Sequence, residues 1–519
     1  MNVGIDLGTT FSLIAQRNDK GIPTLFPDLL DANLFRTPSV VHVQGSSALV
    51  GQIAEDLLRD DPSLPAARGA KLQLGTDAVV LRDAAGHEYG AAATSALILK
   101  KLKRDAEAFA GDSITGCVIC VPAQFGDAQR RAVRDAALAA GLPPPRLVDE
   151  PVAAAIYHGV QGAATPRTLL VYDLGGGTFD ATVLEVGPAG LRVLGTDGTD
   201  KVGGMRFDEL IMEWIVEEAR ARGADVRKDL GAMQRVRRIA EQIKIDLSKP
   251  GRGQVKETAM LAGAPVEFLL TRTRFEQGVE PLLLETIAAS ERCLKSAGLT
   301  WGSVDQVLLC GGSSLLPCVK DTLLRRSGRS AGSLLLNQPH QAVAFGAALV
   351  ADQGREQLDV SHATTFDLGL RVHDPVTRAP KVQVLIPRNT PLPARHAQVF
   401  YTTRPDQARM VFEIVQARGA ADPGRSLGYF AFGPIAEPRK NYPIELVCAC
   451  DADGLVRVTA RDPRTGKELE HLLVEGGWGW GCSPDEPHSQ FHRKPAFERV
   501  SFHYWRYKVT ALLTQPLLT

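Results

Sequence analysis

The chain has 519 residues, with 59 Lys or Arg and 59 Asp or Glu, so its formal net charge is zero. That balance excludes the strong overall field by which basic proteins attract nucleic acid or anionic membranes. Hydrophobic residues make up 44% and charged residues 23%, which is the composition of a globular protein rather than a disordered one. At about 100 to 200 residues per domain, the length predicts roughly two to four domains.

Membrane segments and metal-binding cysteines are not expected. No apolar run approaches the ~18 to 20 residues that span a bilayer, and the N-terminus lacks a signal-peptide pattern. We therefore expect a cytoplasmic protein that binds neither membrane nor nucleic acid. Cys117 and Cys120 form a C-x-x-C, but in a strand their side chains point to opposite faces, so buried cysteines are favoured over a zinc site.

Residues 1–352 alternate short apolar strands with amphipathic helices, which predicts an α/β domain. The clearest strands are expected at residues 116–121, 168–172, 191–195 and 304–310. The clearest helices are expected at residues 127–140, 207–222, 232–247 and 275–296.

The pattern changes after a polar stretch, residues 353–365, which we interpret as a linker. Residues 366–475 show period-two segments separated by turns, which predicts an all-β sandwich. Strands are expected at residues 381–386, 410–415, 444–450, 455–460 and 468–474, with hairpin turns at 451–454 and 462–467. Residues 476–519 are rich in aromatic residues, Gly and Pro, and are interpreted as an atypical tail without regular structure rather than a nucleic-acid surface.

Two similar segments, residues 5–10 and 172–180, lie far apart in the first region. Each is an apolar strand that ends in an aspartate, Asp6 or Asp173, and then turns through glycine and threonine. Glycine lets consecutive backbone N–H groups converge on phosphate oxygens, and the aspartate can hold Mg²⁺ through its water shell. Either segment alone is weak, but the pair predicts a site that grips a triphosphate from two sides. A third glycine turn, at residues 308–314, could approach a nucleoside.

Because the three glycine turns follow one another in this order along the chain, the sequence resembles the heat-shock protein 70 (DnaK-like) chaperone family. Further matching segments are residues 148–155, Lys71 within 69–72, residues 237–248, and in the β region 368–370, 386–393 and 451–468. The resemblance implies an actin-like ATPase domain, a duplicated ribonuclease H-like fold, followed by a β-sandwich. The helical lid usual in the family is expected to be absent after residue 475.

The resemblance also implies a role for each matching residue in binding Mg²⁺ with ATP or ADP. The residues expected to surround the attacking water are Lys71, Glu150, Asp180 and Thr178, and those expected to bind Mg²⁺ through water are Asp6 and Asp173. The residues expected to bind nucleotide are Asp6, Gly8, Thr9, Thr10, Phe11, Asp173, Gly175, Gly176, Gly177, Gly204, Glu241, Lys244, Ser248, Gly311, Gly312 and Ser313. Without the resemblance, Lys71 is an ordinary surface lysine, and Glu241 and Lys244 are an ordinary helix-surface pair.

The β-sandwich of this family holds extended apolar segments of unfolded proteins. The residues matching that groove are Leu370, Val372, Phe400, Met410 and Phe412, although alternating apolar residues on a strand also fit a plain core. Arg146 matches an arginine that docks a J-domain co-chaperone, and a solvated arginine is the alternative.

Several positions depart from the family pattern. Two arginines that flank adenine in the family are replaced by Ile245 and Leu315, and His340 replaces an acidic residue near the nucleoside. Met205 and Arg206 replace an acidic pair, and the linker retains little of the family's leucine run. These changes predict weaker base recognition and weak coupling between the domains.

The sequence thus favours an ATP-hydrolysing, chaperone-like protein that binds exposed apolar peptide segments. One alternative is a non-cycling peptide-binding module in which ATP only stabilises the fold. Another is a small-molecule kinase on the actin-like fold, which the appended β region disfavours.

Overall fold

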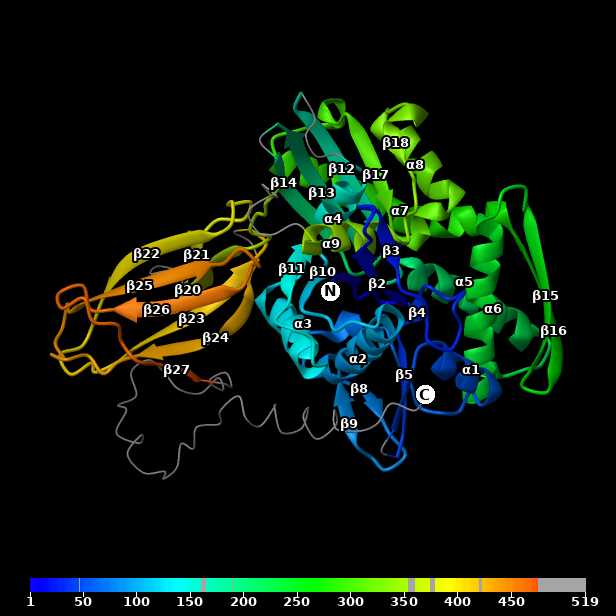
Figure 1. Ribbon diagram of the computed structural model, residues 1–519, viewed down its shortest axis with the longest axis horizontal. Coiled ribbons are helices and arrows are strands. Elements are labelled where there is room, and N and C mark those ends of the chain that lie inside the picture. Colours follow the sequence, from blue (N-terminus) through cyan, green and yellow to red (C-terminus); the bar gives the residue numbers. More distant parts are fainter. Residues whose placement is uncertain are drawn as a thin grey trace. The chain divides into compact units, whose positions relative to one another are not determined.

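The structure, a computed structural model, describes residues 1–45, 47–159, 165–188, 190–352, 360–373, 379–419 and 422–474. These residues form two compact units (Figure 1). The first unit contains residues 1–125 and 129–361, and the second contains residues 126–128 and the described residues from His362 onward. The tail predicted at 476–519 and residues 353–359 of the predicted linker lie outside the described residues.

Two sheets of the same plan form the centre of the first unit. One has the order β11-β10-β1-β2-β3, with β4 also beside β2, and the other has the order β18-β17-β12-β13-β14-β19. In each sheet a central strand, β1 (Asn2–Asp6) or β12 (Arg167–Leu174), has a parallel neighbour on one side and an antiparallel hairpin partner on the other. This repetition confirms the predicted duplicated, actin-like fold.

The other strands of these sheets are β2 (Phe11–Arg17), β3 (Pro23–Leu25), β4 (Thr37–Pro38), β10 (Gly116–Val121), β11 (Arg146–Asp149), β13 (Phe179–Gly187), β14 (Gly190–Thr199), β17 (Gln306–Cys310), β18 (Leu334–Leu335) and β19 (Val360–Ser361). Smaller sheets are formed by β5 (Val40–Gln44), β6 (Ser47–Val50) and β7 (Ala67–Arg68), by β8 (Val79–Arg82) and β9 (Glu88–Gly90), and by β15 (Gln254–Leu261) and β16 (Ala264–Thr271). Because β19 pairs with β14, part of the predicted linker is a strand of the second sheet.

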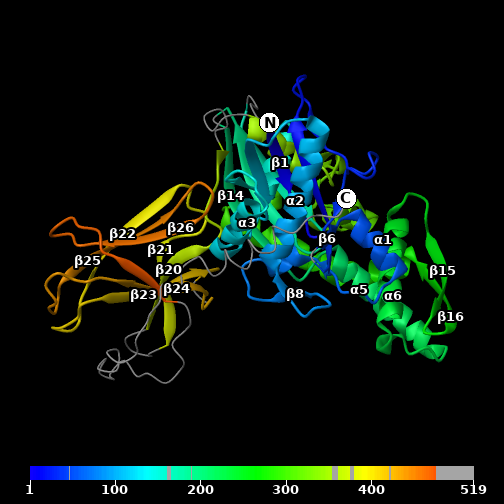
Figure 2. The same cartoon turned by 60° about the horizontal axis from the view of Figure 1, so that its bottom comes forward.

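The α-helices of the described residues are α1 (Gln52–Asp60), α2 (Ala91–Ala110), α3 (Asp127–Ala139), α4 (Glu150–Tyr157), α5 (Gly204–Ala221), α6 (Leu230–Ser248), α7 (Arg272–Ser296), α8 (Pro317–Ser327) and α9 (Ala342–Asp352). The hairpin β15–β16 lies beside α6, at one end of the first unit (Figure 2). The helices and strands predicted in residues 1–352 are all present, as α3, α5, α6, α7, β10, β12, β14 and β17.

Helices α4 and α9 pack against each other, and their small residues permit a close approach. A Cβ built on Gly346 of α9 would lie only 1.8 Å from the carbonyl oxygen of Ala153 in α4. Helix α9 also packs on β1, where a Cβ on Gly4 would lie 2.0 Å from the backbone nitrogen of Ala348. These contacts fix α4, whose first residue is Glu150, against the strand that ends at Asp6.

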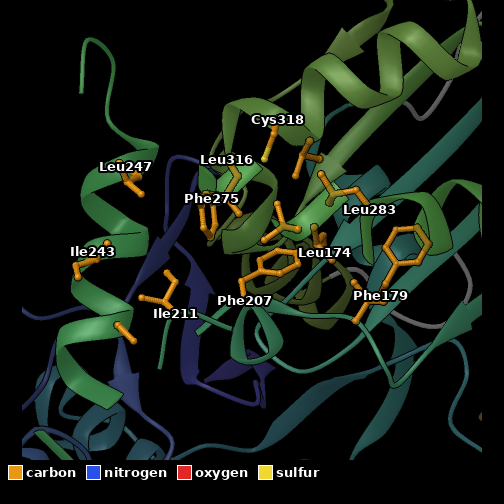
Figure 3. Packing of buried hydrophobic residues seen from close by; sticks show 14 of the residues in the cluster. Leu174, Phe179, Phe207, Ile211, Ile243, Leu247, Phe275, Leu283, Leu316 and Cys318 are labelled. Atoms are coloured by element: carbon orange, nitrogen blue, oxygen red, sulfur yellow. The ribbon is translucent and has the colours of Figure 1, made fainter. Parts of the chain in front are cut away.

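A large apolar core supports the second glycine turn (Figure 3). Leu174 and Phe179, which flank the turn on either side, are both fully buried. They belong to one cluster with Phe207 and Ile211 of α5 and with residues of α6, α7 and α8. Because both ends of the turn are anchored in this core, residues 175–178 have little freedom to move away from it.

The second unit is a β-sandwich, as predicted. One sheet has the order β21 (Pro380–Ile386), β20 (Asp367–His373), β23 (Met410–Ala417), β24 (Arg425–Phe432) and β27 (His471–Val474), and the other has the order β22 (Ala394–Tyr401), β25 (Pro443–Cys450) and β26 (Val456–Arg461). The two sheets share one apolar core that includes Ile414, Phe432 and Ile444, each 0% exposed.

The predicted hairpin at residues 451–454 is confirmed, because β25 and β26 pair as antiparallel neighbours. The turn predicted at residues 462–467 is also present, since Asp462 N donates to the carbonyl of Lys467 at 2.9 Å, but the segments on either side of it share only the bridge of Arg461 with Glu468. After that bridge the chain crosses to the other sheet, where β27 pairs with β24. Cys117 and Cys120 are buried in β10, as the sequence predicts.

The contact between α4 and α9 gives a test of the packing. Replacing Gly346 by alanine drives a methyl group into the Ala153 carbonyl, and we expect the free energy of unfolding to fall by about 2 kcal/mol or more. Gly332→Ala is the matched control, because a Cβ there meets nothing within 4 Å, and a change below about 0.5 kcal/mol is expected. Chemical unfolding of the two variants measures both values. Equal effects would contradict the close approach of the two helices.

Candidate nucleotide site

The two glycine turns of the sequence meet in the structure. The first connects β1 to β2 through Gly8, Thr9 and Thr10, and the second connects β12 to β13. A Cβ built on Gly176 would lie 2.2 Å from Thr10 Oγ1, so a larger residue at that position would displace the Thr10 hydroxyl. A Cβ on Gly177 would likewise lie 2.9 Å from Thr9 Cγ2. Turns from the two sheets are therefore in direct contact, with their backbone amides and threonine hydroxyls gathered in one place.

The third glycine turn joins the same cluster. Ser313 Oγ donates a hydrogen bond of 2.9 Å to the carbonyl of Gly175, and Gly204 N donates one of 3.0 Å to the same oxygen. Gly311 has a φ of 77°, and a Cβ there would lie 2.6 Å from Asp173 Oδ1. Glycine is required here by both the backbone conformation and the close approach.

Lys71 and Glu150 form a buried ion pair beside these turns. Lys71 lies in the short helix η1 (Ala70–Gln73), and its Nζ donates to Glu150 Oε1 at 2.5 Å. Lys71 is 8% exposed and Glu150 is 9% exposed, so the pair is almost removed from water. The ammonium also lies 5.9 Å from the centre of the Phe125 ring. A lysine in this environment is not the solvated surface residue that its sequence context alone suggests.

The carboxylates near Lys71 repel one another. Burial and the charge of Glu150 raise the pKa of Asp6 to about 7, although Lys71 opposes the shift. Burial, followed by the charges of Glu150, Asp180 and Asp6, raises the pKa of Asp173 well above its usual range. Burial disfavours the ammonium of Lys71, but Glu150, Asp6 and Asp173 outweigh it and raise the lysine pKa. The cluster carries more acidic groups than Lys71 can neutralise, and a divalent cation would relieve that excess.

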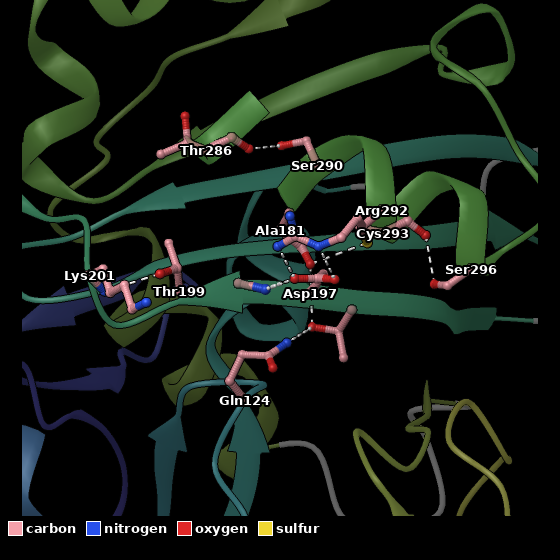
Figure 4. Close-up of polar contacts among 12 residues, drawn as sticks. Gln124, Ala181, Asp197, Thr199, Lys201, Thr286, Ser290, Arg292, Cys293 and Ser296 are labelled. Atoms are coloured by element: carbon pink, nitrogen blue, oxygen red, sulfur yellow. Dashed lines mark hydrogen bonds and ion pairs between the residues drawn. The ribbon is translucent and has the colours of Figure 1, made fainter. Parts of the chain in front are cut away.

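Residues on the Asp180 side are held by contacts between β13, β14 and α7 (Figure 4). The thiol of Cys293 contacts the carbonyls of Ala181 and Gly195, each at 3.3 Å. Arg292 makes two hydrogen bonds to Asp197, of 2.8 and 3.1 Å. Gln124 Nε2 donates to Thr196 Oγ1 at 2.9 Å, which ties the loop after β10 to the second sheet. Asp180 is 5% exposed, and Thr178 is partly buried in the turn before it.

Sequence reasoning missed two residues next to Glu150. Arg130 donates to Asp149 Oδ1 at 2.6 Å and to the carbonyl of Phe125 at 2.9 Å, and both charged residues are buried. The pair holds the segment before Glu150 to the loop that carries Phe125. Asp149 directly precedes Glu150, but nothing in the sequence indicated its partner, since Arg130 lies 19 residues away in an amphipathic helix.

The residues expected to contact adenosine lie along α6. Lys244 does not pair with Glu241; it donates to Asp208 Oδ2 at 2.7 Å and to the carbonyl of Gly204 at 3.2 Å. Burial raises the pKa of Asp208 to about 6 despite this partner. Asp208 was not identified from the sequence. Ser248 donates to the carbonyl of Lys244 at 2.9 Å, within the helix.

The two aliphatic replacements, Ile245 and Leu315, are 45% and 40% exposed. Large apolar side chains at this exposure are available to contact a flat aromatic ligand.

A different cleft, of about 570 Å³, lies between α7 and α8 and is lined by none of the residues expected to bind nucleotide.

The residues expected to line a peptide groove lie in and around the core of the sandwich. Leu370, Met410 and Phe412 are buried members of that core, at 2%, 8% and 8% exposure. Val372 and Phe400 are partly buried and pack against it, with the rings of Phe400 and Phe412 5.1 Å apart. Arg146, expected to dock a J-domain, begins β11 and is partly buried.

The fold and the clustered turns define a class of protein: an actin-like nucleotide-binding domain joined to a β-sandwich. A model of the Hsp70 protein family matches residues 68–477, which is well over half of the chain. The chain belongs to the Hsp70 family. Members of the family are chaperones that bind ATP or ADP with Mg²⁺, hydrolyse ATP and bind unfolded polypeptides. The first glycine turn precedes the matched residues, so its assignment depends on its contact with the second turn.

Among the residues that the structure describes, no helix is both long and apolar enough to cross a membrane.

The raised pKa of Asp6 predicts how stability depends on pH. Between about pH 4 and 7 the folded state binds the Asp6 proton more tightly than the unfolded state, so the free energy of unfolding falls as pH rises. Asp6→Asn removes this effect. We therefore compare the free energies of unfolding of the variant and of the unsubstituted protein without Mg²⁺. The difference between them should shift in favour of the variant by on the order of 1 kcal/mol as the pH rises from 5 to 8.

Thermal unfolding in chelator at several pH values measures this difference. Asp61→Asn is the control, because Asp61 is exposed and hydrogen bonds from Ser63 lower its pKa, so that variant should gain nothing at pH 8. A difference for Asp6→Asn that stays constant with pH would show that its carboxylate is not crowded by the others.

Proposed function

We propose that this protein is an ATP-dependent chaperone-like protein that hydrolyses ATP slowly and binds exposed apolar, extended peptide segments. One observation carries the proposal: a buried Lys71–Glu150 pair lies beside Asp6 and Asp173, where two glycine turns from a duplicated fold are in contact. The Hsp70 membership supplies the general function, and this geometry supports its chemical step in this chain.

The proposed hydrolysis needs positioning and charge stabilisation rather than a covalent intermediate. Backbone amides around Gly8–Thr10 and Gly175–Gly177 would bind the phosphates, and Lys71 would stabilise charge on the transferred group. Glu150 would orient the attacking water, because its carboxylate is fixed by Lys71 and by its place at the start of α4. Asp180 and Thr178 would complete the water site from the second turn.

The crowded carboxylates fit a bound Mg²⁺. Asp6 and Asp173 end the two central strands, and each has a pKa raised in part by the other acidic groups of the cluster, as expected for ligands that lack their cation. When bound, the ion would neutralise phosphate charge. Asp6 and Asp173 would hold its water molecules, and their repulsion would fall.

Peptide binding by the second unit is supported by its β-sandwich fold and by the family. Leu370, Met410 and Phe412 are so deeply buried that their main contribution would be to shape the core beneath a groove. Val372 and Phe400 are the expected groove residues that retain accessible surface. A small-molecule kinase would have no use for this appended unit.

Lys71 gives the sharpest test of hydrolysis. Lys71→Ala removes the cation expected at the transferred phosphate, and single-turnover cleavage of ATP should fall by about 100-fold or more. ATP affinity should change much less, because backbone amides contribute most phosphate contacts. Rapid-quench measurement of phosphate release and calorimetric titration separate the two quantities.

Lys103→Ala is the control, since Lys103 forms a more exposed ion pair with Glu107 within α2 and belongs to none of the three glycine turns. Its cleavage rate should be unchanged. Unaltered cleavage in Lys71→Ala would remove this lysine from the mechanism, and phosphorylation of a metabolite by the unsubstituted protein would favour a kinase.

Peptide release tests whether nucleotide controls the second unit. In a cycling chaperone, a fluorescent apolar heptapeptide should leave at least about tenfold faster with ATP than with ADP. Stopped-flow release from the intact chain measures both rates. Equal rates would favour a peptide-binding module in which ATP only stabilises the fold.

A further inference from the structure

Arg36 lies beside the first glycine turn, although no sequence motif indicated it. Its guanidinium carbon is 4.8 Å from the centre of the Phe11 ring, and Phe11 directly follows Thr10 of the turn. The segment after Arg36 is tied to the turn by two hydrogen bonds, from Ser39 N to the carbonyl of Thr10 and from Ser39 Oγ to the carbonyl of Gly8, each 2.8 Å. The backbone near Arg36 is therefore fixed relative to the amides that are expected to bind phosphate.

On the other side, His340 lies against the third glycine turn and within the electrostatic influence of Arg36. A Cβ built on Gly312 would lie 2.5 Å from His340 Cε1, and Gly311 N donates to the carbonyl of Pro339 at 3.1 Å. Burial and then the positive charge of Arg36 lower the pKa of His340, so the charge of Arg36 acts on the imidazole. Arg36 thus lies near residues expected to bind nucleotide from both halves of the first unit.

The charge of Arg36 has no carboxylate partner among the ion pairs of the described residues. Some exposed arginines of the unit do have one, such as Arg17, which pairs with Asp352, and Arg59, which pairs with Asp56, while others in the described ranges, such as Arg167, do not. An unpaired arginine on an open surface is ordinary, but this one is stacked on a ring at the edge of a site for an anionic ligand. The imidazole of His340 carries no negative charge to compensate that of Arg36, whereas a carboxylate at that position would.

We propose that Arg36 binds phosphate oxygens of the nucleotide and is a specificity-determining residue of this site. The inference rests on the proposed nucleotide function and names a residue that none of the motifs described above contains. It also explains how the site tolerates Ile245 and Leu315, since a charge-assisted contact to phosphate replaces affinity that is lost at the base. Recognition then depends more on the phosphates than on the nucleobase.

The experiment compares adenosine, ADP and ATP on the full-length protein, with affinities measured by competition against a fluorescent ATP analogue in Mg²⁺. Arg36→Gln should weaken ADP and ATP by about 3- to 10-fold and leave adenosine unchanged. The salt dependence of ATP affinity should also become shallower in this variant, because one cation is missing. Arg36→Lys should retain part of the affinity and most of the salt dependence.

Arg59→Gln is the matched control, because it removes an exposed arginine of the same unit, and it should change none of the affinities. His340→Asp gives an independent test, because a carboxylate placed near Arg36 should also lower the affinity for ATP. This effect should be smaller when Arg36 has already been replaced by glutamine.

The outcomes separate the two proposals. Loss confined to ADP and ATP supports the assignment of Arg36. No loss, or an equal loss for adenosine and ATP, overturns it while the ATP site stands. Failure of the unsubstituted protein to bind any of the three ligands overturns the proposed function and this inference with it.

Discussion

The contact between the two glycine turns is the constraint on which the site depends. Thr10 and Gly176 approach so closely that a single methyl group would separate them. That approach requires both sheets, the apolar core behind Leu174 and Phe179, and the small-residue packing of α4 on α9. Each loop by itself is an ordinary turn. Much of the first unit therefore serves to fix the distance between these two loops.

The cost of this arrangement is electrostatic. Folding places Asp6, Asp173 and Glu150 around one ammonium, and the pKa values of both aspartates rise as a result. A protein selected only for stability would not retain such a cluster, because burying like charges is unfavourable. The cluster is better explained as a site prepared for a cation and a polyphosphate. Positive charge near the site is then a property on which ligand affinity depends.

The departures from the family pattern concern the edges of the site rather than its centre. Lys71, Glu150 and the glycine turns are all present, whereas Ile245, Leu315 and His340 differ at positions where the resemblance expects contacts to the nucleoside. Dispersion against aliphatic side chains can hold a base but does not select one strongly. In the proposed site, the chemistry of the centre and the selectivity of the rim are thus separable, and the proposal for Arg36 concerns the rim.

The positions of the clearest strands and helices, the β-sandwich and the glycine motifs could be predicted from sequence, because periodicity and turn residues are local signals. The partners could not. Nothing local indicated that Arg130 pairs with Asp149, that Lys244 pairs with Asp208 rather than with Glu241, or that Arg36 stacks on Phe11. The crossing of the chain after Arg461 to a different sheet was also missed, because a turn sequence specifies a reversal but not the neighbour that follows. Sequence by itself determined the elements and the chemical groups; the tertiary structure alone decided which charges are buried together, since burial and pairing depend on contacts between segments far apart in the chain.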